Sequence, residues 1–211
     1  MSDMLITISR QYGAGGSEVA QRVAAALGWR LVDNEMIEQV AARAGLKPED
    51  VAELEERVPT FVERLARTLA AASPELFPPT PGGHGCSPVE EADLVRITET
   101  VVAEIADQGK VVMVGRSAPA VLGRRSDALH VKLVASRPYR INVASLRLHV
   151  PHAKAAEILD STDRMRARYN REYYDRDWND PANYHMVLNT EALGIDGAVD
   201  VIVGRARALG W

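Results

Sequence analysis

A glycine-rich turn near the start of the chain has the residue types that bind phosphate. It runs from Ser9 to Ser17 with the sequence SRQYGAGGS, between a β-branched run and an alanine-rich helical pattern. Glycines let successive backbone N–H groups turn toward an anion, and the N-terminus of the following helix adds partial positive charge. The residues that could offer these N–H groups are Gly13, Ala14, Gly15 and Gly16. Ser17 stands where a hydroxyl caps the helix or contacts Mg2+, although a plain strand-to-helix turn would have the same composition.

This glycine turn departs at two positions from the usual nucleotide-binding signature, G-x-x-x-x-G-K-[ST]. Arg10 occupies the place of the first glycine, and Gly16 occupies the place of the lysine. A triphosphate bound here would therefore lack the lysine that neutralises its β- and γ-phosphates. Arg10 is the nearest cation in the sequence and is long enough to reach over the turn. Its alternative role is that of a solvent-facing arginine paired with a surface carboxylate.

The turn is predicted to lie at the edge of a parallel sheet, because short apolar runs alternate with helical patterns along the chain. The predicted strands are Leu5–Ser9, Arg30–Val32, Val111–Gly115, Leu129–Val134 and His185–Asn189. The predicted helices are Ser17–Leu27, several over 34–72, Val89–Asp107, Ser136–Tyr174 with a break near Pro151, and Ile195–Leu209. A loop rich in proline and glycine covers 73–88. The expected architecture is α/β, a doubly wound five-stranded parallel sheet flanked by helices.

The composition excludes several other classes of protein. The chain has 211 residues, of which 46% are hydrophobic and 26% charged, with a formal net charge of −4 and a single cysteine. These values are typical of a globular chain without an internal disulfide or a cysteine-rich zinc site, and they disfavour general nucleic-acid binding. No apolar run approaches the roughly 18 residues of a membrane span, and the first residues lack a signal-peptide pattern. We therefore expect a cytoplasmic protein with no nucleic-acid or membrane partner.

Charged residues outside the turn could complete a phosphate site. Asp33 ends the second predicted strand, at the carboxyl edge where such sheets bind ligands. It could hold Mg2+ through water, orient an acceptor oxygen, or cap the helix that follows. Arg116 follows the third predicted strand, where a guanidinium is well shaped for bidentate phosphate binding. The stretch 137–176 is rich in basic residues, and Arg164 and Arg168 within it share a helix face. That stretch is either a solvated helix face or a lid that closes over phosphates.

Five segments resemble, in order and spacing, those of CMP kinases and, more closely, those of the divergent cytidylate kinase-like family. These segments are Ile8–Ser17, Leu31–Ile37, Val112–Arg116, Leu133–Arg140 and Tyr184–Asn189. The resemblance implies a P-loop kinase fold and phosphoryl transfer from ATP, with Mg2+, to a nucleoside monophosphate. CMP or dCMP is the expected acceptor. It also implies that Arg116 contacts the acceptor phosphate and that an aspartate and arginines of the lid grip the nucleotide.

The residues and the resemblance together predict a set of site residues. Donor binding is assigned to 13–17, and the metal to Ser17 and Asp33. Acceptor binding is assigned to Asp33, Gln39, Arg116, Arg140 and Asp163. Catalytic roles are assigned to Arg10, Asp33, Arg116, Arg164 and Arg168. We expect one kinase-like domain over 1–211, with a core (1–33, 108–136, 184–211), a helical acceptor-binding excursion (34–107) and a basic lid (137–183). The lid is expected to be mobile, because its arginines would repel one another without a ligand.

Two departures from the CMP kinase pattern leave alternatives open. Gln39 stands about where CMP kinases carry an arginine for the acceptor phosphate, which favours a different hydroxylated or phosphorylated metabolite as acceptor. The missing lysine at Gly16 would also suit a nucleotide-binding regulatory protein without strong catalysis. A Rossmann dehydrogenase is disfavoured, because the turn lacks G-x-G-x-x-G.

Overall fold

A computed structural model describes residues 4–33, 91–115, 117–123 and 125–211. Contacts divide the chain into two compact units, Met1–Asp33 with Val102–Trp211 and Asn34–Val101, and all five strands lie in the first unit. The helices predicted over 34–72, the loop over 73–88, Gln39 and Arg116 lie outside the described residues.

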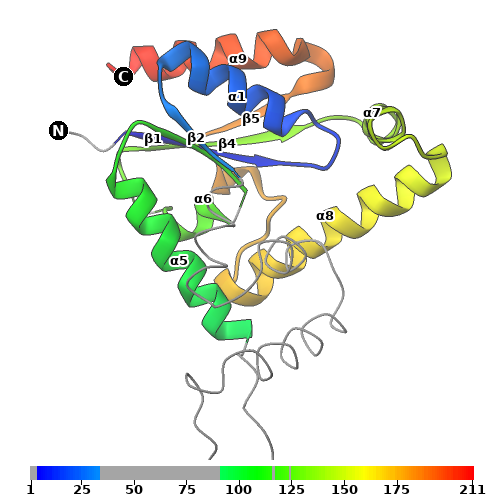
Figure 1. The fold of residues 1–211 in the computed structure, drawn as a ribbon, viewed down its shortest axis with the longest axis horizontal. Coiled ribbons are helices and arrows are strands. Elements are labelled where there is room, and N and C mark those ends of the chain that lie inside the picture. The colour runs from blue at the N-terminus through cyan, green and yellow to red at the C-terminus, as the bar shows by residue number, and fades with distance from the viewer. Residues whose placement is uncertain (1–3, 34–90, 116, 124) are drawn as a thin grey trace, which may run out of the picture. The chain divides into compact units, whose positions relative to one another are not determined.

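A five-stranded parallel sheet forms the centre of the first unit (Figure 1), as predicted. The strands are β1 (Leu5–Arg10), β2 (Arg30–Val32), β3 (Val111–Val114), β4 (Ala128–Val134) and β5 (Met186–Asn189). Their order across the sheet is β2-β3-β1-β4-β5, so β1 is the central strand. Because every pair is parallel, all five carboxyl ends lie at one edge of the sheet, and the glycine turn leaves from the middle of that edge.

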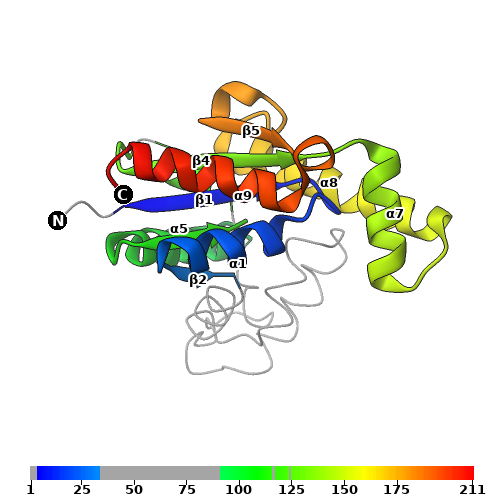
Figure 2. The same ribbon diagram turned by 90° about the horizontal axis from the view of Figure 1, so that it is seen from above.

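Two helices cover one face of this sheet. Helices α1 (Gly16–Leu27) and α9 (Thr190–Ala208) pack side by side there (Figure 2). Helix α1 ends at Gly28, whose φ of 64° is the left-handed conformation that favours glycine at a helix end. Helix α9 begins five residues before the predicted Ile195, but Gly194, with φ 69° and ψ 171°, interrupts its first turn.

The remaining helices include two that the sequence did not predict. Helix α5 (Glu91–Asp107) follows the prediction closely, and α7 (Arg137–Leu148) and α8 (His152–Tyr174) are separated by the predicted break near Pro151. Helix α6 (Ala118–Val121) and the 3-10 turn η1 (Pro181–Asn183) are the additional ones. Among the described residues, no helix is both long enough and apolar enough to cross a membrane.

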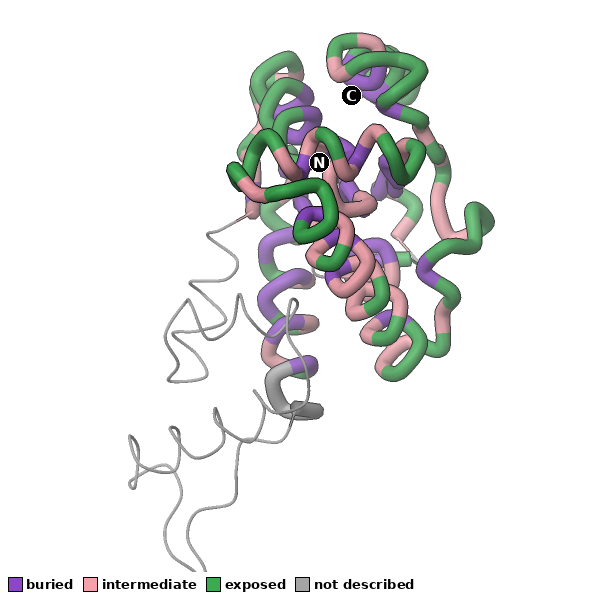
Figure 3. The backbone as a smooth tube through the Cα atoms, turned by 90° about the vertical axis from the view of Figure 1, so that its right-hand side faces the viewer, coloured by how far each residue is buried: buried purple, intermediate pink, exposed green. Residues whose placement is uncertain are grey.

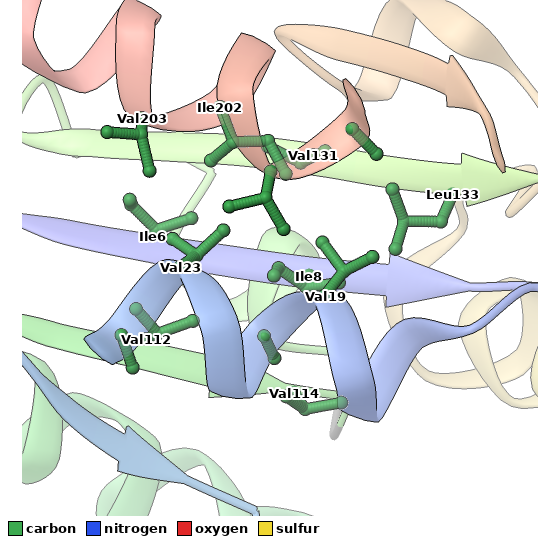
Figure 4. Packing of buried hydrophobic residues seen from close by; sticks show 14 of the residues in the cluster. Ile6, Ile8, Val19, Val23, Val112, Val114, Val131, Leu133, Ile202 and Val203 are labelled. Carbon is green, nitrogen blue, oxygen red and sulfur yellow. The ribbon is translucent and has the colours of Figure 1, made fainter. Parts of the chain in front are cut away.

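The main core lies between the sheet and helices α1 and α9 (Figure 4). Alternate strand residues point into it, among them Ile6 and Ile8 of β1 and Val131 and Leu133 of β4. These meet an apolar stripe of α1 that includes Val19 and Val23, and all are fully buried. Burying one such aliphatic side chain contributes roughly 1.5–3 kcal/mol, so this layer fixes the strand from which the glycine turn departs.

The opposite face of the sheet carries buried polar side chains instead. They are Thr7, Ser9, His130 and Lys132, and none is more than 6% exposed. The segment 175–185, which we call the strap, passes over this face between α8 and β5 (Figure 1). Burial falls off away from the sheet: the strands are mostly buried, whereas α7 and α8 are mainly intermediate or exposed (Figure 3).

Candidate functional site

The glycine turn has a backbone that only glycine adopts easily. Gly13 and Gly15 have φ values of 80° and 73°, in the left-handed region that side chains disfavour. A Cβ at Gly13 would also lie 2.7 Å from the Arg140 carbonyl oxygen, closer than real Cβ atoms approach. Gly15 is the N-cap of α1, so the helix begins directly at the turn.

Several N–H groups of the turn have no acceptor. In the described part of the chain, no hydrogen bond engages the backbone N–H of Gly13, Gly15, Gly16 or Ser17. The Ser17 side chain is exposed, and among the described residues its hydroxyl makes no hydrogen bond that would cap the helix. Free N–H groups at a helix N-terminus form an anion site, and a free hydroxyl beside them can contact a bound ligand. The turn therefore has the donors that a polyphosphate needs.

Arg140 and Asp163 hold the turn in this shape. Arg140 Nη1 donates to the Tyr12 carbonyl oxygen over 3.2 Å and to Asp163 Oδ2 over 2.6 Å, and its Nε donates to the Ala135 carbonyl oxygen. Asp163 Oδ1 accepts from the Tyr12 N–H over 2.8 Å. Both side chains are largely buried, with 8% and 17% exposed. The structure thus brings these two predicted acceptor residues together at the turn, with their polar atoms engaged by protein.

Two further residues support the turn, and the sequence reasoning did not assign either of them a role. Arg166 Nη1 donates to the Arg10 carbonyl oxygen over 3.0 Å and lies 3.6 Å from Asp163 Oδ1. The buried Thr190 hydroxyl donates to the Ala14 carbonyl oxygen over 3.1 Å. A signal for Arg166 was its spacing of three residues from Asp163 on α8, which puts both on one face.

The predicted pair Arg164 and Arg168 lies elsewhere on α8. Both side chains are exposed, and Arg168 Nε donates to Glu172 over 3.0 Å. Within the described residues, no hydrogen bond or ion pair joins either of them to the glycine turn. Arg166 lies two positions from each, a rotation of about 200° on a helix, which explains why it faces the turn and they do not.

Two arginines of α7 carry carboxylate partners on α8 without any ligand. Arg137 pairs with Asp160 over 2.7 Å, and Arg140 pairs with Asp163. The Arg137 guanidinium also lowers the pKa of the Asp160 carboxyl below its usual value. For these two arginines, the mutual repulsion on which the expected mobile lid rests is therefore offset by acidic residues of α8.

Arg10 is placed differently from these paired arginines. Its stem lies against Gly16, and its guanidinium lies against Gly115, which follows β3. In the part of the chain that the structure describes, its guanidinium makes no hydrogen bond or ion pair. Asp33 is partly buried directly after β2, at the same edge but two strands from β1.

Lys132 forms a buried cluster beside the turn that the sequence did not reveal. It is 1% exposed, donates to the Trp178 carbonyl oxygen and to Asn179 Oδ1, and lies 3.8 Å from the centre of the Trp178 ring. Trp178 Nε1 in turn donates to Ser9 Oγ over 2.9 Å, next to Arg10. Burial lowers the pKa of Lys132 to about 8. The one sequence signal was a lysine between Val131 and Leu133 in an apolar strand, and its partners lie more than 40 residues away.

The fold and the turn define the class to which this chain belongs. A five-stranded parallel sheet with a glycine turn between its central strand and the first helix is the P-loop kinase fold. A profile of the cytidylate kinase-like family matches residues 5–192, and the chain belongs to that family. The resemblance noted in the sequence is thereby confirmed.

Solved structures share this fold at low sequence identity. An uncharacterized protein from Eubacterium ventriosum has a TM-score of 0.68 at 18% identity, over 96% of this chain and 97% of that one. The shikimate kinase from Bacteroides thetaiotaomicron has a TM-score of 0.56 at 13% identity, over 97% and 98%. Among curated proteins, a uronate isomerase from Corynebacterium glutamicum is 29% identical over 106 residues. That match spans 50% of this chain but only 20% of the isomerase.

Proposed function

We propose that the protein is a phosphotransferase that moves the γ-phosphoryl group of ATP to a nucleoside monophosphate, with CMP or dCMP as the preferred acceptor. The observation that carries the proposal is the set of unengaged N–H groups at Gly13, Gly15, Gly16 and Ser17. Membership of the cytidylate kinase-like family supports the nucleotide as substrate.

In the proposed reaction, a phosphate oxygen of the acceptor attacks the γ-phosphorus of ATP and forms a new P–O bond. The bond between that phosphorus and the β,γ-bridging oxygen breaks, and ADP keeps its electron pair. CMP and ATP would thus give CDP and ADP, with no other reactant consumed. Such a transfer demands positioning and charge neutralisation rather than covalent chemistry by the protein. The glycine turn would hold the β-phosphate, while Arg140 and Asp163 would keep the turn open by their contacts with Tyr12.

The residues present also fit a magnesium ion bound together with ATP. Mg2+ keeps several waters and takes one or two protein oxygens plus phosphate oxygens, rather than a dedicated cage of side chains. Ser17 offers a free hydroxyl and Asp33 a carboxylate at the same sheet edge, whereas no cluster of three or more candidate ligands exists among the described residues. When bound, the ion would neutralise phosphate charge and align the reacting oxygens.

The acceptor is proposed to lie near the carboxyl ends of β2 and β3, where Asp33 and Arg116 follow in the sequence. Gln39 gives a reason to consider a second acceptor class, a hydroxylated or phosphorylated metabolite other than a nucleotide. The fold itself does not choose between the two, because one structural neighbour is a shikimate kinase. A regulatory nucleotide-binding protein is the third candidate, since Gly16 replaces the usual lysine.

A coupled assay of ADP release with ATP and Mg2+ tests the proposal against a panel of nucleoside monophosphates and hydroxylated metabolites. We expect CMP or dCMP to give the highest kcat/KM. A matched pair of variants locates the activity: Ser17→Ala should reduce it, whereas Thr100→Ala, which removes a hydroxyl bonded within α5, should leave it unchanged. Turnover of another acceptor class would overturn the nucleotide assignment. Binding of ATP without turnover of any acceptor would favour the regulatory protein.

A further inference from the structure

We propose that the cation and the glycine of the phosphate-binding turn have exchanged places, and that Arg10 is the catalytic cation, aimed at the phosphoryl group in transit. The inference rests on the proposed phosphotransferase function and adds the identity of the group that replaces the missing lysine. In the usual signature, glycine stands at the first position and lysine just before the final hydroxyl. Here arginine stands at the first of these positions, Arg10, and glycine at the second, Gly16.

Gly16 is a glycine because the Arg10 stem occupies the space beside it. A Cβ built on Gly16 would lie 2.5 Å from Arg10 Cγ, 2.8 Å from its Cβ and 3.2 Å from its Cδ. The Arg10 Cβ is fixed by the backbone, so no change of the Arg10 rotamer relieves this contact. A lysine at position 16 and an arginine at position 10 therefore exclude one another.

Gly115 makes room for the other end of the same side chain. Its φ is 78°, and a Cβ there would overlap Arg10 Nη1 and lie 3.2 Å from Cζ. Strands β1 and β3 are neighbours, with Ile8 opposite Val114, so Arg10 crosses directly from one strand end to the other. Its guanidinium thus reaches the residue that precedes Arg116, on the side of the turn where the acceptor is proposed to bind.

Hydrogen bonds fix the backbone at Arg10, whereas its guanidinium, among the described residues, is free to bind a ligand. Arg166 donates to its carbonyl oxygen, and the preceding Ser9 hydroxyl accepts from Trp178 Nε1. The guanidinium itself has no partner among the described residues, unlike Arg22, Arg125, Arg137 and Arg140, which all pair with carboxylates. A guanidinium offers five N–H donors that suit phosphate oxygens, so an unpaired one between the glycine turn and Gly115 is placed to bind a phosphoryl group.

The test compares four folded variants in single-turnover phosphoryl transfer and in calorimetric binding of a non-hydrolysable ATP analogue with Mg2+. Arg10→Met keeps the stem against Gly16 and removes only the guanidinium. We expect it to lower the transfer rate at least about tenfold, the effect of one lost charged hydrogen bond. Gly16→Lys alone should be no better than wild type, because the two side chains collide. Arg10→Gly with Gly16→Lys restores the usual signature and should recover most of the rate lost in Arg10→Met.

Arg22→Ala is the matched control, because it removes an exposed guanidinium that already pairs with Glu18 on α1. An Arg10→Met protein with the wild-type rate would overturn the inference, as would a folded double variant no faster than Arg10→Met. Should the double variant fail to fold, the Arg10→Met rate decides. A wild-type protein that binds no triphosphate would instead overturn the proposed function itself, so the two failures are distinguishable.

Discussion

Asp163 joins two parts of the site through a single carboxylate. One oxygen accepts from the Tyr12 N–H of the glycine turn, and the other pairs with the buried Arg140. Removing the charge leaves a buried guanidinium without compensation. Asp163→Asn should therefore lower the free energy of unfolding by about 3 kcal/mol, measured by urea denaturation, and weaken triphosphate binding as the turn loosens.

Asp160→Asn provides the control for that prediction. Asp160 also pairs with an arginine of α7, but Arg137 and Asp160 are exposed, and exposed pairs contribute little to stability. Equal stabilities of the Asp163 and Asp160 variants would contradict the role of Asp163 as a buried support of the turn.

Arg116 follows β3, and we predict that it binds the anionic group of the acceptor and not the donor. A lost charged hydrogen bond typically costs ~1.5–3 kcal/mol, or roughly ten- to a hundredfold in binding. Arg116→Ala should raise the KM for the acceptor by that factor while the affinity for ATP stays nearly constant. Loss of ATP binding in calorimetry, with acceptor binding retained, would reverse the assignment.

At the scale of elements, a buried histidine adds a side-chain contact between β1 and β4. His130 Nδ1 lies 2.8 Å from Thr7 Oγ1, and the ring stacks on His185. Burial, and then the neighbouring His185, lowers the pKa of His130 to about 4 from 6.5. Between about pH 4 and about pH 6.5 the unfolded chain binds more protons at this histidine than the folded protein does. The stability that neutral His130 contributes is therefore complete above about pH 6.5 and is lost as the pH falls toward about 4.

The shift of His130 corresponds to about 3 kcal/mol, at about 1.4 kcal/mol for each pKa unit. Urea denaturation at about pH 7 and about pH 5 should therefore show a steep loss of stability in wild type and a smaller loss in His130→Gln. His149→Gln, at an exposed histidine, should follow wild type. Identical pH dependence in all three proteins would show that His130 is not the titrating group.

Helices α7 and α8 form an element whose residues are mainly intermediate or exposed, and Asp163 and Arg166 connect it to the turn. We predict that it closes further over bound phosphates, because closure excludes water from the reacting groups. Amide hydrogen exchange across Ile158 to Asp177 should slow when ATP and acceptor are both present, relative to either alone. Equal protection with and without ligands would leave these helices as a fixed support of the turn.

At the scale of the whole molecule, the strands and long helices were predictable because their local patterns are strong. The run Val111–Val114 is apolar throughout, as expected for a strand buried on both faces. Helix α6 and η1 were missed because four and three residues are too few to show a period. The interruption of α9 comes from the positive φ of Gly194. A single glycine in a helical pattern does not predict such an interruption.

The part of the site that could be predicted is the part formed by one continuous segment. The glycine turn is continuous in sequence, so its phosphate-binding character could be recognised from residue types alone. Its supports come from far along the chain: Arg166 and Thr190 reach it across 156 and 176 residues. Arg164 and Arg168 share a helix face, but the sequence alone does not reveal which face of α8 meets the turn.

A crystal structure with CMP and a non-hydrolysable ATP analogue tests the central claim most directly. We expect the β-phosphate to lie within hydrogen-bond distance of the N–H groups of Gly13, Gly15 and Gly16. We also expect the Arg10 guanidinium to lie between the γ-phosphate and the phosphate of CMP. A nucleotide bound elsewhere, with the N–H groups of the glycine turn still without a ligand, would contradict that claim.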